Sequence, residues 1–116
     1  MIKNNHFPLL RSVGDEEDGR SLEIKEFQNL IRQIYFTRDA RRGPDKTFLW
    51  LLEEVGELIR SYRRQDGNFG KEMADVIAWL VSMANLLELD LEDELLKKYP
   101  RVCPLCSSIP CTCPFR

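Results

Sequence analysis

Histidine is almost absent from this chain, because His6 is the only histidine among its 116 residues. His6 lies in residues 1–20, which show no hydrophobic periodicity, so we expect a solvated side chain in an irregular arm. A Ser-His-Asp or Cys-His catalytic site would have to recruit a residue from that arm. A ferritin-like di-metal centre is also disfavoured, because it needs Glu-x-x-His pairs and the sequence has none. Any catalysis must therefore depend on other side chains.

Long hydrophobic runs and an excess of positive charge are missing as well. No apolar stretch approaches the roughly 18 residues that cross a bilayer. The formal net charge is −2, which does not favour a nucleic-acid partner held mainly by electrostatics. The N-terminal arm lacks the apolar centre of a signal peptide and carries the acidic run "DEED". These absences predict a cytoplasmic protein without a membrane or nucleic-acid partner.

The strict alternation of apolar and polar residues that marks a β-strand does not occur either. Apolar residues recur instead at the three- and four-residue spacing of amphipathic helices. This spacing predicts an all-α fold, a four-helix bundle. The expected helices span about residues 22–37, 46–64, 69–88 and 91–99.

Capping and breaking residues set the expected boundaries. Ser21 and Asp90 are expected N-caps, and Pro100 should end the last helix. Residues 38–45, "RDARRGPD", read as a basic loop. The chain then divides into an N-terminal arm (1–20), a helical domain (21–100) and a cysteine-rich tail (101–116).

A helical body of this size is marginal for one hydrophobic core. Trp50 and Trp79 also fall off the centre of the apolar stripes of their helices, which indicates a second buried surface. We therefore expect a homodimer or a dimer-of-dimers tetramer.

Carboxylates, unlike histidines, are concentrated on two neighbouring expected helices. The first helix carries three of them within one and a half turns, and the second carries two that are three positions apart. An antiparallel hairpin through the turn sequence "QDGN" places Glu57 opposite Glu72. One turn away, it places Glu54 opposite Asp75. Glu53 is the fifth member of this constellation.

Such a convergence is unfavourable without a positive charge, because two like charges repel by about 4 kcal/mol at ~4 Å in an effective dielectric of ~20. Basic neighbours are few: Arg60 is within reach of Glu57, and Lys71 is within reach of Asp75. A site of carboxylate oxygens without His or Cys suits a hard cation such as Mg²⁺ or Mn²⁺. The plainer alternative is a solvated acidic face, which the complementary register of the two pairs disfavours.

The acidic motif resembles that of a known family. "EEVGE" (53–57), a 14-residue spacer and "EMAD" (72–75) match the E-E-x-x-E…E-x-x-D signature of MazG-like nucleotide pyrophosphohydrolases, in the all-α NTP pyrophosphatase superfamily. The resemblance covers roughly residues 22–102. It implies a four-helix MazG-like bundle and Mg²⁺-dependent hydrolysis of a nucleoside triphosphate to the monophosphate and pyrophosphate.

The resemblance also implies roles for the carboxylates. Glu54, Glu57, Glu72 and Asp75 would be metal ligands. Glu53 would be a further ligand or the base that orients the attacking water.

Substrate contacts are expected outside the acidic motif. By the resemblance, Lys98 would contact phosphate and Asn85 the nucleotide. Arg41, with Arg42, could approach phosphates from a neighbouring subunit, and Trp50 could border a base pocket. The structural alternatives are a dipole-favoured lysine at a helix end, a solvated loop and a tryptophan packed at an interface.

All four cysteines lie in the C-terminal tail, in "CPLCSSIPCTC". The C-P-x-C spacing is typical of a zinc half-site, although Ser107 stands where the turn usually has glycine. One tetrahedral zinc is the favoured hypothesis, with disulfides, a redox role or free thiols left open. The candidate zinc ligands are Cys103, Cys106, Cys111 and Cys113.

Two alternative functions remain at this point. Phosphoribosyl-ATP pyrophosphohydrolase is the nearest relative by motif. A non-enzymatic interaction module, with a zinc tail and a solvated acidic surface, is the alternative from another class. The base, the sugar and the number of metals do not follow from the sequence.

Overall fold

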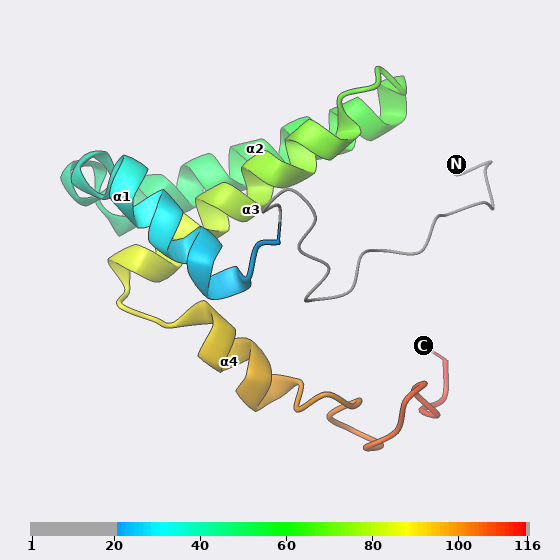
Figure 1. Ribbon diagram of the computed structural model, residues 1–116. Helices are drawn as coiled ribbons and strands as arrows, with labels where there is room; N and C mark the ends of the chain where they lie inside the picture. The colour runs from blue at the N-terminus through cyan, green and yellow to red at the C-terminus, as the bar shows by residue number, and fades with distance from the viewer. Residues whose placement is uncertain (1–20, 116) are drawn as a thin grey trace.

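The computed structural model describes residues 21–115, so the N-terminal arm with His6 lies outside the described residues. Within that range the chain forms helices and no strand, which confirms the all-α prediction (Figure 1). None of these helices is long and apolar enough to cross a membrane. The helices are α1 (Ile24–Arg42), α2 (Pro44–Arg64), α3 (Phe69–Leu86) and α4 (Leu91–Lys98).

Both ends of α1 differ from the sequence prediction. Its N-cap is Glu23 rather than Ser21, in a capping box with Glu26. The predicted basic loop is wrong, because α1 continues to Arg42 and only Gly43 interrupts the two helices. Gly43 has a φ of +85°, a conformation that glycine adopts without strain. The arginines extend α1 because cations at a helix C-terminus are favoured by the helix dipole.

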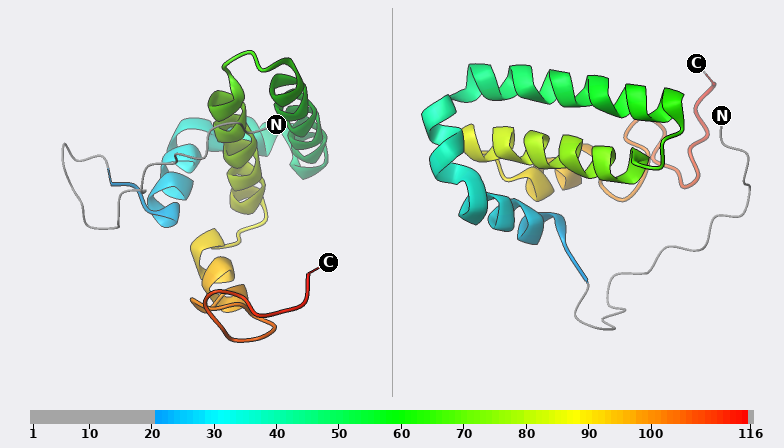
Figure 2. Two further views of the ribbon diagram at one scale, coloured as in Figure 1. Left: turned by 90° about the vertical axis from the view of Figure 1, so that its right-hand side faces the viewer. Right: turned by 90° about the horizontal axis from the view of Figure 1, so that it is seen from above.

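The helices α2 and α3 form the predicted antiparallel hairpin (Figure 2). Gln65 ends α2 in the left-handed conformation, with a φ of 51°. The Asp66 carboxylate accepts hydrogen bonds from Ser61 Oγ at 2.7 Å and from the Asn68 backbone N–H at 3.0 Å. These bonds fix the turn, and α1 then packs against α3.

The short helix α4 begins at Leu91, and Asp90 is its N-cap, as predicted. The Asp90 side chain accepts a hydrogen bond from the Asp93 backbone N–H at 3.1 Å. In both Figure 1 and the left view of Figure 2, α4 extends away from the α2–α3 hairpin. Its main partner is α1.

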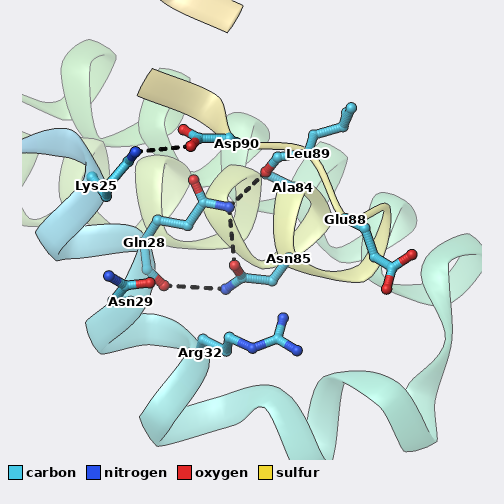
Figure 3. Close-up of a pocket in the computed structure, with 9 residues that line it drawn as sticks. All are labelled: Lys25, Gln28, Asn29, Arg32, Ala84, Asn85, Glu88, Leu89 and Asp90. Carbon is cyan, nitrogen blue, oxygen red and sulfur yellow. Dashed lines mark hydrogen bonds and ion pairs between the residues drawn. The ribbon is translucent and has the colours of Figure 1, made fainter. Parts of the chain in front are cut away.

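A network of amide hydrogen bonds ties α1, α3 and the start of α4 together (Figure 3). Gln28 Nε2 donates to Asn85 Oδ1 at 3.1 Å and to the Leu89 carbonyl at 2.7 Å. Asn85 Nδ2 donates in return to the Gln28 carbonyl at 3.3 Å, and the Leu91 N–H donates to Gln28 Oε1 at 2.9 Å. Asn85 is 3% exposed, so its partners within the chain replace water.

The apolar core of the described chain is small. Its buried hydrophobic residues are Ile31, Leu51, Val81 and Ala84. Most apolar residues at helical spacing on α2 and α3 are exposed instead, including Leu52 at 67% and Ile59 at 53%. They form a stripe on each helix, and the rings of Tyr62 and Phe69, 5.5 Å apart, join the two stripes at the turn. We call this surface the hairpin apolar face: Phe48, Leu52, Ile59, Tyr62, Phe69, Met73, Ile77 and Leu80.

Replacing Gln28 with alanine should destabilise the fold, because the buried Asn85 Oδ1 and the Leu89 carbonyl would lose the donor Gln28 Nε2. We expect the free energy of unfolding to fall by about 1–3 kcal/mol. Urea denaturation followed by circular dichroism measures this change. The matched control is Asn29→Ala, the next residue on α1, which is exposed and bonded to no other described side chain. Equal unfolding midpoints for the two variants would contradict the assigned role of the network.

Candidate metal centre

Three carboxylates converge between α2 and α3. One oxygen from each of Glu54, Glu72 and Asp75 lies within 4.8 Å of the other two. Glu72 and Asp75 share a face of α3 because they are three positions apart. Glu54 reaches them because the hairpin brings α2 back alongside α3. We call these three residues the acidic group.

The acidic group disfavours the charged form of Glu54. Burial raises the pKa of Glu54 above its usual value, and the charge of Asp75 raises it further, ahead of Glu72 and Glu57. Among the neighbouring charges Asp75 contributes most to the raised pKa, which agrees with the predicted hairpin register, in which Asp75 faces Glu54.

The acidic group has the chemistry and the size for a hard divalent cation. Oxygen ligands lie about 2.1 Å from Mg²⁺, so two ligands of one ion are separated by at most about 4.2 Å. The three oxygens, all within 4.8 Å of one another, are close to that span. A bound cation would also stabilise the charged form of Glu54, which burial and the neighbouring carboxylates disfavour.

Two of the predicted site residues lie outside the acidic group. Glu57 forms an ion pair with Arg60, one turn further along α2. Its charge is therefore already compensated in this conformation. Glu53 is exposed on α2. Metal ligation by Glu57 and a catalytic role for Glu53 stay predictions.

A cavity of about 250 Å³ lies beside the acidic group, and Asp75 belongs to both. Trp79 forms an aromatic part of its wall. The Trp79 ring stacks on Trp50 with centroids 5.9 Å apart, and the Arg42 guanidinium carbon lies 4.8 Å from the Trp79 centroid. The two tryptophans, which lie off the apolar stripes of their helices, therefore pack on each other within one chain. The cavity is lined by Tyr35, Arg38, Asp39, Arg42, Asp75, Ala78, Trp79 and Ser82.

The sequence analysis missed Asp39. Its side chain is buried, and its Oδ1 accepts a hydrogen bond from Arg42 Nη1 at 2.9 Å. Its Oδ2 is also buried but accepts no hydrogen bond from the described residues. Arginine-rich surroundings suggested a solvated loop, so burial was not expected. The available signal was helical spacing, since Asp39 lies four positions after Tyr35 and three before Arg42.

Other predicted substrate contacts are not brought to the acidic group within this chain. Arg41 is exposed in the last turn of α1. Asn85 pairs with Gln28 and lines a second cavity, of about 360 Å³ (Figure 3). Lys98 is the last residue of α4, which extends away from the hairpin (Figure 1). Nucleotide contacts by these residues stay predictions.

The four cysteines converge with one another in the tail, beyond α4. Hydrogen bonds from Thr112 lower the pKa of Cys106 to about 5. The neighbouring Cys111 raises the pKa of Cys113 to about 12. The tail is thus a second group of potential metal ligands, made of sulfur rather than oxygen.

Two comparisons with known proteins bear on this chain. Residues 42–107 match the model of the MazG nucleotide pyrophosphohydrolase domain family. A protein of Cyanophage S-2L, a dATP/dGTP diphosphohydrolase, is 35% identical over 75 residues, which cover 65% of this chain and 69% of that protein. The family match includes α2 and α3, and therefore the whole acidic group.

Metal binding should depend on pH through Glu54. Because its pKa is raised in the folded state, Glu54 favours folding of the metal-free protein at low pH and opposes it as pH rises through that pKa. Added Mg²⁺ or Mn²⁺ should therefore raise the melting temperature by about 4 °C or more at pH 7.5 and by less at pH 5. Thermal unfolding with and without metal at both pH values measures this difference.

Two variants make that experiment specific. Glu54→Gln should lose most of the metal-induced shift, because it removes a ligand. Glu94→Gln, an exposed carboxylate on α4, should keep it. An equal shift in both variants would place metal binding elsewhere.

Proposed function

The chain belongs to the MazG nucleotide pyrophosphohydrolase family, and we propose that it hydrolyses a nucleoside triphosphate to the monophosphate and pyrophosphate. The observation that carries this proposal is the acidic group at the α2–α3 hairpin. Three carboxylates at such short range repel an anionic triphosphate unless a cation lies between them. The site therefore suits a substrate that arrives with a divalent metal.

In this proposal the carboxylates of α2 and α3 bind the metal and orient the attacking water. Glu54, Glu72 and Asp75 would hold Mg²⁺ or Mn²⁺, and Glu57 would join them by exchanging Arg60 for the metal. When bound, the metal neutralises phosphate charge and lowers the pKa of a coordinated water. Glu53, exposed one position before Glu54, is assigned to orienting the attacking water or accepting its proton.

We further propose that the preferred substrates are purine deoxynucleoside triphosphates. The Cyanophage S-2L relative is a dATP/dGTP diphosphohydrolase. The cavity beside Asp75 adds an aromatic wall, Trp79, against which a base can stack. At the same cavity, Asp39 Oδ2 is an acceptor without a partner among the described residues. The amino group of a purine is a matching donor.

Phosphoribosyl-ATP is the alternative substrate, because the same acidic group could serve its hydrolysis. Its base is also a purine, so the cavity does not separate the two. The Cyanophage S-2L relative favours a free deoxynucleotide.

We also propose that the active form is a homodimer or a dimer of dimers, assembled through the hairpin apolar face. Few apolar side chains are buried within one chain, and the described chain alone leaves both stripes in water. A standard protein interface buries about 800 Å² on each partner. A second copy could cover this face, and it could bring Arg41 or Lys98 to the acidic group of its partner.

The enzymatic proposal predicts pyrophosphate release in the presence of Mg²⁺. Turnover should be faster with dATP and dGTP than with dCTP and dTTP. Glu54→Gln and Asp75→Asn should each lower kcat at least about 100-fold, because they remove charge that positions the metal. A coupled pyrophosphate assay across all nucleoside triphosphates and phosphoribosyl-ATP measures these rates.

The assay has one matched control and one further test variant. Glu94→Gln removes an exposed carboxylate from α4 and should leave the rate unchanged. Glu53→Gln tests the assignment of Glu53, since a solvated residue would show the rate of the Glu94 variant. A folded wild-type protein that hydrolyses no nucleotide would overturn the proposal.

The assembly proposal predicts a dimer or tetramer at micromolar concentration. Light scattering during size-exclusion chromatography measures the mass. The double variant Leu52→Lys with Ile59→Lys should shift the protein toward monomer, because it charges the centre of the hairpin apolar face. Leu105→Lys, in the tail and 81% exposed, is the control that should not. A monomeric wild-type protein would refute the proposed assembly.

A further inference from the structure

The tail from Cys103 to Cys113 has no hydrophobic core of its own. It contains no helix or strand, and its largest apolar side chains, Leu105 and Ile109, are 81% and 74% exposed. Segments this short need a cross-link or a metal to hold one conformation. The side chains that do meet inside the tail are its four cysteines.

The sulfur atoms meet at a characteristic spacing. Cys103 Sγ lies 3.8 Å from Cys113 Sγ, and Cys106 Sγ lies 3.9 Å from Cys111 Sγ. All four sulfurs lie within 4.8 Å of one another, and no pair is bonded as a disulfide. In a tetrahedral zinc site the Zn–S distance is about 2.3 Å, which sets neighbouring sulfurs about 3.8 Å apart.

The backbone of the first half-site has the turn that this geometry needs. The Ser107 N–H donates to the Cys103 carbonyl at 2.8 Å, and the Cys103 N–H donates to the Ser108 carbonyl at 3.2 Å. Ser107 adopts a φ of +58°, the left-handed conformation for which glycine is the usual residue. The serine at this position therefore does not prevent the turn.

The second half-site directs N–H groups at the sulfurs. The Thr112 N–H lies 3.3 Å from Cys106 Sγ, and the Cys113 N–H lies 3.3 Å from Cys111 Sγ. Donors at this distance stabilise thiolates, which are the form that binds metal. The tight C-x-C spacing thus supplies both ligands and the groups that orient them.

We propose that Cys103, Cys106, Cys111 and Cys113 bind one Zn²⁺ in a closed, tetrahedral, structural site that is separate from the acidic group. Four protein ligands leave no open position for water or substrate, so the site holds the tail together and takes no part in hydrolysis. The metal replaces the core that the tail lacks.

Elemental analysis of the full chain, purified under reducing conditions, tests this proposal. We expect one zinc per chain after dialysis against Mg²⁺ buffer. Cys103→Ser and Cys113→Ser should each lower the zinc content at least about tenfold, since each breaks the ligand set. Leu105→Ser, in the same loop, and Glu54→Gln, in the acidic group, should both retain the zinc.

A thiol titration and hydrogen exchange complete the test. A thiol reagent should react slowly with the zinc-loaded protein and should find four thiols once zinc is removed. Amides of residues 103–113 should then exchange at least about tenfold faster, while those of α2 should not change. Iron in place of zinc, four thiols that react freely in a metal-free protein, or no thiols before reduction would each overturn the proposal.

Discussion

The convergence of the three carboxylates of the acidic group depends on the α2–α3 hairpin, and the rest of the proposed site depends on that convergence. Burial raises the pKa of Glu54, and the charges of Asp75 and Glu72 raise it further. A fold keeps such an arrangement when its cost is recovered at another step, and the proposed binding of metal and substrate would be that step. Glu57 differs from these three carboxylates, because its charge is balanced by an ion pair with Arg60 on the same helix.

The C-terminal end of α1 adds the wall of a cavity beside the acidic group. Because α1 runs to Arg42 before Gly43 turns the chain, Asp39 and Arg42 reach the wall of the cavity that Asp75 shares. The stacked pair of Trp50 and Trp79 supports that wall from α2 and α3. Three helices thus meet at this cavity, which under the proposed function would take the base of the nucleotide.

The sequence was most informative where local rules decide the outcome. Helical spacing, the turn at 65–68 and the Asp90 cap predicted α2, α3, α4 and the register of Glu54 with Asp75. It was less informative where tertiary packing decides. The three arginines around Asp39 predicted a solvated loop. The Asp39 carboxylate is buried instead, because α1 stays helical there and packs on α3. The sequence also does not predict whether Glu57 pairs with Arg60 or binds a metal, because Arg60 lies three positions away and the predicted metal ligands lie on the same helix face.

Gly43 is the single residue between α1 and α2, and it forms hydrogen bonds with both helices. Its N–H donates to the Asp39 carbonyl at 2.9 Å, and its carbonyl accepts from Thr47 Oγ1 at 2.8 Å. Thr47 Oγ1 in turn accepts from Arg42 Nη1 at 3.3 Å. The Arg42 bond links the last turn of α1 to the first turn of α2, so it opposes a change in the angle between the two helices. Under the proposed function, the base would meet a wall of Asp39 and Arg42 that is already formed before the ligand arrives, so selection would rest on the shape of that wall.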